Sequence, residues 1–212
     1  MRIKLLLLSV LFILSFAYFS YTVAKEKLTK IDFDTTVKLQ DHIQRRFDKY
    51  FSYFSLLGSV EVTVGFCAVM VILSLIRLKW LKCLGWSMII PASMAEVFGK
   101  LILFHPSPPN FLHRSILPIN LPFYVHTDYS YPSGHMTRTL FIVTILFCMF
   151  YRSNKILGKL IIIPGLVGLI ILMGLTRVYL GEHWLSDVIG GSILGIGVGF
   201  FASVLILQTK KV

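Results

Sequence analysis

The sequence has 212 residues, of which 56% are hydrophobic, and its mean hydropathy is +0.77. This apolar share exceeds that of a soluble globular domain and indicates an integral membrane protein. The formal net charge of +11 comes largely from short basic clusters between apolar runs, which membrane topology explains better than nucleic-acid binding. The three cysteines lie within apolar runs, so the sequence shows no disulfide framework.

Six apolar runs separated by polar segments predict an all-α integral membrane bundle of six transmembrane helices, organised as a single domain over residues 1–212. The expected spans are about 5–23, 51–76, 84–104, 136–151, 160–175 and 188–207. A cleaved signal peptide is the alternative for the first run, because Thr22-Val23-Ala24 resembles a small-residue cleavage site. The run exceeds the usual apolar core of about 7–15 residues in signal peptides, which favours a span.

The segment 24–50 between the first two spans is polar and mixed in charge. Its apolar residues recur at near-helical spacing, which predicts an amphipathic helix on the membrane surface. They are Ile31, Phe33, Val37, Leu39, Ile43 and Phe47. Two roles are open for this helix: a solvated connector between spans, or a flap that helps to admit a lipid.

Charged residues within the second and third spans are costly at membrane depth and usually face a partner or a wet cavity. Glu96 and Lys100 are four residues apart, so we expect them to pair along one helix face. Lys100, near the outer end of its span, is equally placed to reach a phosphate. Glu61 has no evident partner, and a structural role is favoured for it over a catalytic one.

The stretch Thr176–Asp187, TRVYLGEHWLSD, combines an arginine, a histidine and an aspartate at fixed spacing. We expect a helix to begin near Glu182, which would place His183 and Asp187 at positions i and i+4 on one face. The carboxylate would then hold one imidazole nitrogen and leave the other as a nucleophile or base. Arg177 offers a planar set of donors suited to a phosphate. The stretch indicates phosphoryl transfer through a histidine.

A second polar stretch, Tyr131–His135, reads YPSGH and precedes another apolar run. Proline and glycine predict a tight turn here. Ser133 and the Gly134 amide are suited to holding an anion. His135 then stands where a general acid is needed.

These residues resemble the type 2 phosphatidic acid phosphatase (PAP2) superfamily of membrane lipid phosphatases, whose motifs are KxxxxxxRP, PSGH and SRxxxxxHxxxD. The second motif is intact at residues 132–135, and the third differs only by Thr176 in place of serine. In the first motif Lys100 is followed at the required distance by Ser107 and Pro108, so a serine stands at the arginine position.

The resemblance implies that His183 attacks phosphorus, that Asp187 orients it, and that His135 protonates the leaving oxygen. It also implies that no metal or other cofactor takes part. The implied phosphate-binding residues are Lys100, Ser133, Gly134 and Arg177, with Ser107 at the position of the missing arginine. A metal site formed by the six histidines is the alternative, but no two of them share a ligand-like helical spacing.

Another residue is expected to supply the missing positive charge. Arg138, three residues after His135, lies on the same helix face and is the first candidate, with a snorkelling charge at the interface as the alternative. Arg114 is the second candidate and His105 the third.

By parity of the six spans, the second and third motifs fall on the same side of the membrane. Four basic clusters hold ten of the 21 Lys and Arg residues and no acids, which places them in the cytoplasm and the site on the outer face of the cell membrane. Seven basic residues in segment 24–50 count against this orientation. The clusters are at residues 2–4, 77–82, 152–159 and 210–211.

The function expected from the sequence is hydrolysis of a lipid phosphate or diphosphate. The family's range includes phosphatidic acid, phosphatidylglycerol phosphate and undecaprenyl diphosphate, and an outward-facing chain of six spans favours the polyprenyl carrier. Two alternatives are a noncatalytic lipid-phosphate binder or carrier and a phosphotransferase that uses an acceptor other than water.

Overall fold

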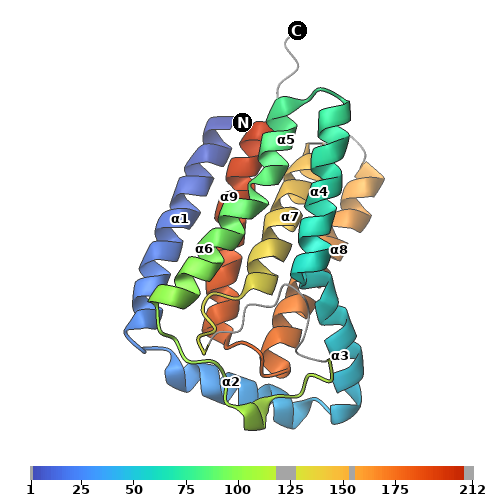
Figure 1. Ribbon diagram of the computed structural model, residues 1–212. Coiled ribbons are helices and arrows are strands. Elements are labelled where there is room, and N and C mark those ends of the chain that lie inside the picture. Colours follow the sequence, from blue (N-terminus) through green and yellow to red (C-terminus); the bar gives the residue numbers. More distant parts are fainter. Residues whose placement is uncertain (1, 118–127, 153–155, 208–212) are drawn as a thin grey trace.

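The computed structural model describes residues 2–117, 128–152 and 156–207, except for the side chains of residues 157 and 158, and these residues are almost entirely helical (Figure 1). An isolated bridge pairs Pro106 with Tyr129. The α-helices are α1 Arg2–Ala24, α2 Thr29–His42, α3 Asp48–Ser55, α4 Val60–Ile76, α5 Trp80–Ser87, α6 Ile89–Ile102, α7 Gly134–Tyr151, α8 Ile156–Tyr179 and α9 Leu185–Ile206. Three short 3₁₀ turns are η1 Arg45–Phe47, η2 Leu56–Gly58 and η3 Asn110–Leu112.

Six helical segments of the described chain are long and apolar enough to cross a membrane, so the predicted six-span, all-α architecture is confirmed. They cover 2–24, 45–76, 80–102, 134–151, 159–179 and 185–206. The second segment begins six residues before the predicted start at residue 51, because η1, α3 and η2 precede α4 and only the extended residue Ser59 separates them from it. The third segment combines α5 and α6.

Helices α7 and α9 form the centre of the bundle (Figure 1). In their most apolar windows 61% and 50% of the residues are buried, against 17% for α1 and α8. The two central helices approach closely because α9 presents Gly191, Gly195 and Gly199 to α7. A Cβ on Gly195 would lie 2.3 Å from the carbonyl oxygen of Thr137, and a Cβ on Gly191 equally close to that of Ser133. Only glycine permits this spacing.

Helix α2 lies across the end of the bundle where α8 ends and α7 and α9 begin (Figure 1). The predicted amphipathic helix is present, but its buried face is the polar one. Asp32, Thr36 and Gln40 are buried at successive turns, whereas Ile31 and Phe33 are exposed. The spacing of the apolar residues shows that the helix has an apolar and a polar face, but it does not show which face packs against the protein. At a membrane interface the apolar face can contact lipid instead.

Gln40 attaches α2 to the spans. Its Nε2 donates to the carbonyl oxygens of Leu112 at 2.7 Å and Tyr179 at 2.8 Å. Since both hydrogen bonds are buried, α2 is a fixed part of the fold. A solvated connector, one of the two roles expected for this segment, would lack such buried contacts. It closes the end of the bundle at which the second and third sequence motifs meet.

Replacing Gly195 by alanine is expected to lower the melting temperature of the detergent-solubilised protein by several degrees. The added Cβ meets the α7 backbone, and overpacking of this kind costs about 1–3 kcal/mol. The matched control is Gly168→Ala on α8, where an added Cβ has no heavy atom within 4 Å. Equal melting temperatures for the two variants would show that the α7–α9 approach does not limit stability.

Candidate active site

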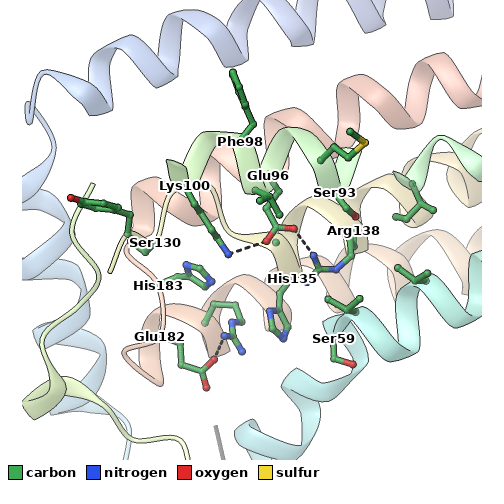
Figure 2. A pocket seen from close by; sticks show the side chains of 18 of the residues that line it. Ser59, Ser93, Glu96, Phe98, Lys100, Ser130, His135, Arg138, Glu182 and His183 are labelled. Carbon is green, nitrogen blue, oxygen red and sulfur yellow. Dashed lines mark hydrogen bonds and ion pairs between the residues drawn. The ribbon is translucent and has the colours of Figure 1, made fainter. Parts of the chain in front are cut away.

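One cavity of about 590 Å³ collects most of the residues that the sequence motifs single out. Figure 2 shows Lys100, His135, Arg138 and His183 turned toward it from α6, α7 and the loop before α9. Ser107, Gly134 and Arg177 also line this cavity. The fold therefore brings residues of all three motifs, more than 80 positions apart in sequence, to one place.

His183 and Asp187 form the predicted pair, although the local structure differs from the expectation. His183 Nδ1 lies 3.3 Å from Asp187 Oδ2, and both residues are buried. Helix α9 begins at Leu185 rather than near Glu182, because Gly181 takes a positive φ of 66° that ends the preceding turn. Asp187 closes the first turn of α9 by accepting from the backbone N–H of Trp184 at 2.9 Å. His183 therefore precedes the helix and is held against it by this cap.

The protonation of His183 follows from its surroundings. Burial lowers the pKa of His183 well below its usual value, and the charges of Arg177 and Lys100 lower it further. The imidazole is accordingly neutral near pH 7. Because a carboxylate only accepts hydrogen bonds, Nδ1 carries the proton and Nε2 keeps its lone pair. This is the form that a nucleophilic histidine requires.

Three cations line the cavity, and each is engaged by a carboxylate. Lys100 Nζ lies 3.0 Å from Glu96 Oε1, as the i, i+4 spacing predicts. Arg138 forms an ion pair with the other oxygen of Glu96, and Arg177 forms one with Glu182. Arg138 is 4% exposed and reaches the cavity, so it does not snorkel to the membrane surface. Among the three candidates for the missing charge, Arg138 has the appropriate location.

The other two candidates have different surroundings. Arg114 does not line the cavity; its Nη1 donates to the Tyr179 hydroxyl at 3.2 Å and its guanidinium lies over the Tyr179 ring. His105 is buried beside Asp187, with Nε2 3.6 Å from Asp187 Oδ1 and 3.3 Å from Ser186 Oγ. Arg114 thus anchors a loop, and His105 supports Asp187 instead of facing the cavity.

The turn before α7 joins the second motif to the third. The Ser133 backbone N–H donates to the Asp187 carbonyl at 3.0 Å, which fixes the two motifs relative to each other. The Ser133 hydroxyl is buried and has no hydrogen-bond partner among the described residues. Ser133 does not line the cavity, whereas Gly134, the first residue of α7, does. The expected phosphate contact is therefore better placed at Gly134 than at the Ser133 side chain.

Sequence reasoning missed two groups of residues that support the site. Glu182 lies within the third motif, but its pairing with Arg177 cannot be inferred from spacing. Asp32 on α2 holds the first turn of α9, accepting from the backbone N–H and the hydroxyl of Ser186, each at 2.8 Å. Asp32, Thr36 and Gln40 recur at four-residue spacing in the sequence, but this spacing does not show that their face is the buried one. Burial raises the pKa of Asp32.

The described residues contain no group of three or more His, Cys, Asp or Glu side chains able to hold a metal ion. The described residues therefore give no support to the alternative of a histidine metal site. Metal-independent catalysis stays a prediction that can be tested directly.

A comparison with protein-family models matches residues 80–211 to the PAP2 superfamily. The chain belongs to this family. It is 33% identical over 131 residues to an undecaprenyl-diphosphatase of Sulfolobus acidocaldarius and 30% identical over 107 residues to phosphatidylglycerophosphatase B of Bacillus subtilis. These matches cover 60% and 49% of this chain, and they span 58% and 51% of the two relatives.

Solved structures of PAP2 proteins share the fold. The PAP2-type phosphatidylglycerolphosphate phosphatase of Bacillus subtilis superposes with a TM-score of 0.72 at 18% identity, covering 92% of this chain and 93% of that one. LpxE of Aquifex aeolicus gives a TM-score of 0.57 at 24% identity, covering 81% and 94%. At these identities the similarity establishes the PAP2 architecture alone.

Replacing Asp32 by alanine is expected to destabilise the first turn of α9. The change leaves two buried donors of Ser186 without their acceptor, which costs about 1–3 kcal/mol. We expect a lower melting temperature and faster hydrogen exchange at residues 185–188. Asp34→Ala, on the exposed side of the same helix, is the control. Identical exchange in the two variants would contradict a role for α2 in holding the site.

Proposed function

We propose that this PAP2 protein hydrolyses a lipid phosphate or diphosphate through a phosphohistidine on His183. The observation that carries the proposal is a buried, neutral His183, oriented by Asp187, at a cavity that also holds His135 and three cations. A nucleophile, its orienting acid, a second histidine and positive charge are the groups that phosphoryl transfer through a histidine requires.

In the first step His183 Nε2 forms a bond to phosphorus as the bond from phosphorus to the leaving oxygen breaks. The negative charge of the bound phosphate favours the protonated form of His135, which gives its proton to that oxygen. In the second step the now neutral His135 takes a proton from water, whose oxygen bonds to phosphorus while the bond to Nε2 breaks. Lys100, Arg138 and Arg177 neutralise the charge on the equatorial oxygens, where most stabilisation of phosphoryl transfer arises.

A lipid substrate suits the walls of the cavity. Beyond the charged end, its lining is mainly apolar side chains of α4 and α6, among them Val64, Ile90, Met94 and Phe98. The three from α6 are 58–66% exposed on the flank of the bundle, in a region expected to contact acyl chains. The head group would then lie among the cations while the tail extends between these two helices. The names of the relatives favour a polyprenyl diphosphate, with phosphatidylglycerol phosphate and phosphatidic acid as further candidates.

The proposed site faces the outside of the cell membrane. It lies at the end of the bundle closed by α2, and the described residues of three basic clusters belong to the opposite end. These are Arg2, Lys4, Arg77, Lys79, Lys82, Arg152 and Lys159. By the positive-inside rule the acid-free clusters favour the cytoplasm for that opposite end, against the seven basic residues of segment 24–50 at the end closed by α2. Lys155 and the cluster at 210–211 lie outside the described residues.

The decisive measurement is phosphate release by purified protein in the presence of EDTA, with undecaprenyl diphosphate, phosphatidylglycerol phosphate and phosphatidic acid as substrates. Wild-type protein should release phosphate, and His183→Ala should lose the activity because no other group replaces the nucleophile. His42→Ala, exposed on α2, is the control. Release that persists in His183→Ala would exclude the phosphohistidine route. Absence of release by wild type on all three lipids would favour a binder or a transferase.

Replacing Arg138 by alanine is expected to lower kcat by about 10²–10³-fold, by analogy with the removal of one charged donor from a transition state. Binding of the protein to substrate-containing micelles should change little, because the lost contact acts on the reacting phosphate. Arg152→Ala, at the far end of the same helix and exposed, is the matched control. Wild-type kcat in Arg138→Ala would show that this arginine does not replace the one missing from the first motif.

A further inference from the structure

The carboxylate of Glu96 lies directly over the first residue of α7. A Cβ on Gly134 would be 2.1 Å from Glu96 Oε1 and 2.4 Å from Oε2, so only glycine fits beneath this carboxylate. The first N–H groups of a helix have no intrahelical partner and attract anions. Gly134 belongs to the PSGH motif, whose turn the sequence predicts to hold a phosphate. A side chain of the protein itself therefore lies against the residue that is expected to contact the phosphate.

The same carboxylate also engages two of the three cations in the cavity. Figure 2 shows Glu96 between Lys100 and Arg138, with an ion pair to each. Glu96 is 5% exposed, and all three residues line the cavity that holds His183. One buried anion thus pairs with the lysine and the arginine to which the proposed function assigns the phosphate, and it lies against Gly134 at the helix end. Lys100, Gly134 and Arg138, the three residues that Glu96 contacts here, are called the cradle.

We propose that Glu96 is a specificity-determining residue: it holds the cradle until a terminal phosphate displaces it, and it keeps out the phosphodiesters of the surrounding bilayer. This inference rests on the proposed function, since it concerns how the same cavity selects its substrate. The two kinds of lipid differ in the charge and in the number of free oxygen atoms of their phosphate groups.

A phosphodiester carries one negative charge and two free oxygens, as the Glu96 carboxylate does. Exchanging one for the other gains no charge interaction with Lys100 or Arg138, and it requires a buried carboxylate to move. A terminal phosphate carries about −1.5 to −2 charges near pH 7 and three acceptor oxygens. It can therefore replace the carboxylate with a net gain. Discrimination arises because the unwanted ligand must compete with an equivalent group already in place.

Such discrimination is useful to an enzyme that lies in a bilayer of phosphodiester lipids, because these lipids compete with the substrate for the site. Phosphodiester lipids surround the flank of the bundle on which the cavity has its apolar lining, and they far outnumber any lipid with a terminal phosphate. An empty cradle with two unpaired cations would attract them. Glu182 pairs with Arg177 in the same way, so each of the three cations has an acidic partner before a substrate arrives, with two carboxylates shared among them.

The test compares wild type with Glu96→Gln, which keeps the size of the side chain and removes its charge. Orthovanadate, an inorganic analogue of phosphate, is titrated against purified protein, and its affinity is obtained from the shift in melting temperature. The titration is repeated in mixed micelles with phosphatidylglycerol as the phosphodiester. For Glu96→Gln we expect at least tenfold tighter vanadate binding and at least tenfold stronger competition by phosphatidylglycerol. For wild type, phosphatidylglycerol should compete weakly.

Two further variants separate charge from shape and from general electrostatics. Glu96→Asp keeps the negative charge and should keep the weak competition by phosphatidylglycerol. Glu61→Gln removes a different acid from the lining of the same cavity and should leave the competition within about twofold of wild type. If Glu96→Asp becomes as sensitive to phosphatidylglycerol as Glu96→Gln, or if Glu61→Gln matches the latter, the role of the Glu96 charge is contradicted.

The outcomes for the inference and for the proposed function are distinct, because vanadate binding needs no turnover. Unchanged or weaker vanadate binding by Glu96→Gln would overturn the inference even if wild type hydrolyses lipid phosphates. Strong competition by phosphatidylglycerol on wild type would overturn it as well, which keeps the test decisive should Glu96→Gln fail to fold. Altered selectivity in Glu96→Gln without phosphate release by wild type would support the cradle and contradict the hydrolase.

Discussion

The site depends on the close approach of α7 and α9. Glycines on α9 let the backbone of α7 come within contact distance, and the hydrogen bond from Ser133 N–H to the Asp187 carbonyl fixes the helices at their common end. His135 follows Ser133 by two residues, and His183 is held to Asp187. The distance between the proposed acid and nucleophile is thus determined by helix packing rather than by a flexible loop, which is the arrangement that precise positioning in catalysis requires.

Charge in an apolar surrounding imposes the second constraint. Buried cations are costly unless they are paired, yet the proposed chemistry needs cations that a phosphate can reach. The protein meets both requirements with carboxylates that face the same cavity, Glu96 for two cations and Glu182 for the third. Both acids lie close to a motif residue in sequence. The positive charges are therefore stable without substrate and available to it.

The sequence was sufficient for the spans and for the residues that converge on the cavity. Span positions follow from length and apolar content, and the His183–Asp187 contact follows from a four-residue spacing, even though α9 begins three residues later than expected. The orientation of α2 was beyond reach, because periodicity gives two faces without saying which meets protein. The contacts of Asp32 with Ser186 and of Glu182 with Arg177 join residues whose proximity only the fold creates.

The serine at position 107, where the family motif has an arginine, is related to the pairing of Arg138 with Glu96. In the family motif an arginine at this position would reach the phosphate from the loop after α6, whereas here Arg138 reaches the cavity from α7. The charge of a buried arginine cannot be solvated by bulk water when no substrate is bound, so it needs an acidic side chain on the facing helix. Glu96 on α6 supplies that partner, four residues before Lys100, and serves both cations with one carboxylate. Arg138 and Glu96 thus form one unit, and under the proposed selectivity the acid that pairs with this buried arginine also decides which phosphates enter the cavity.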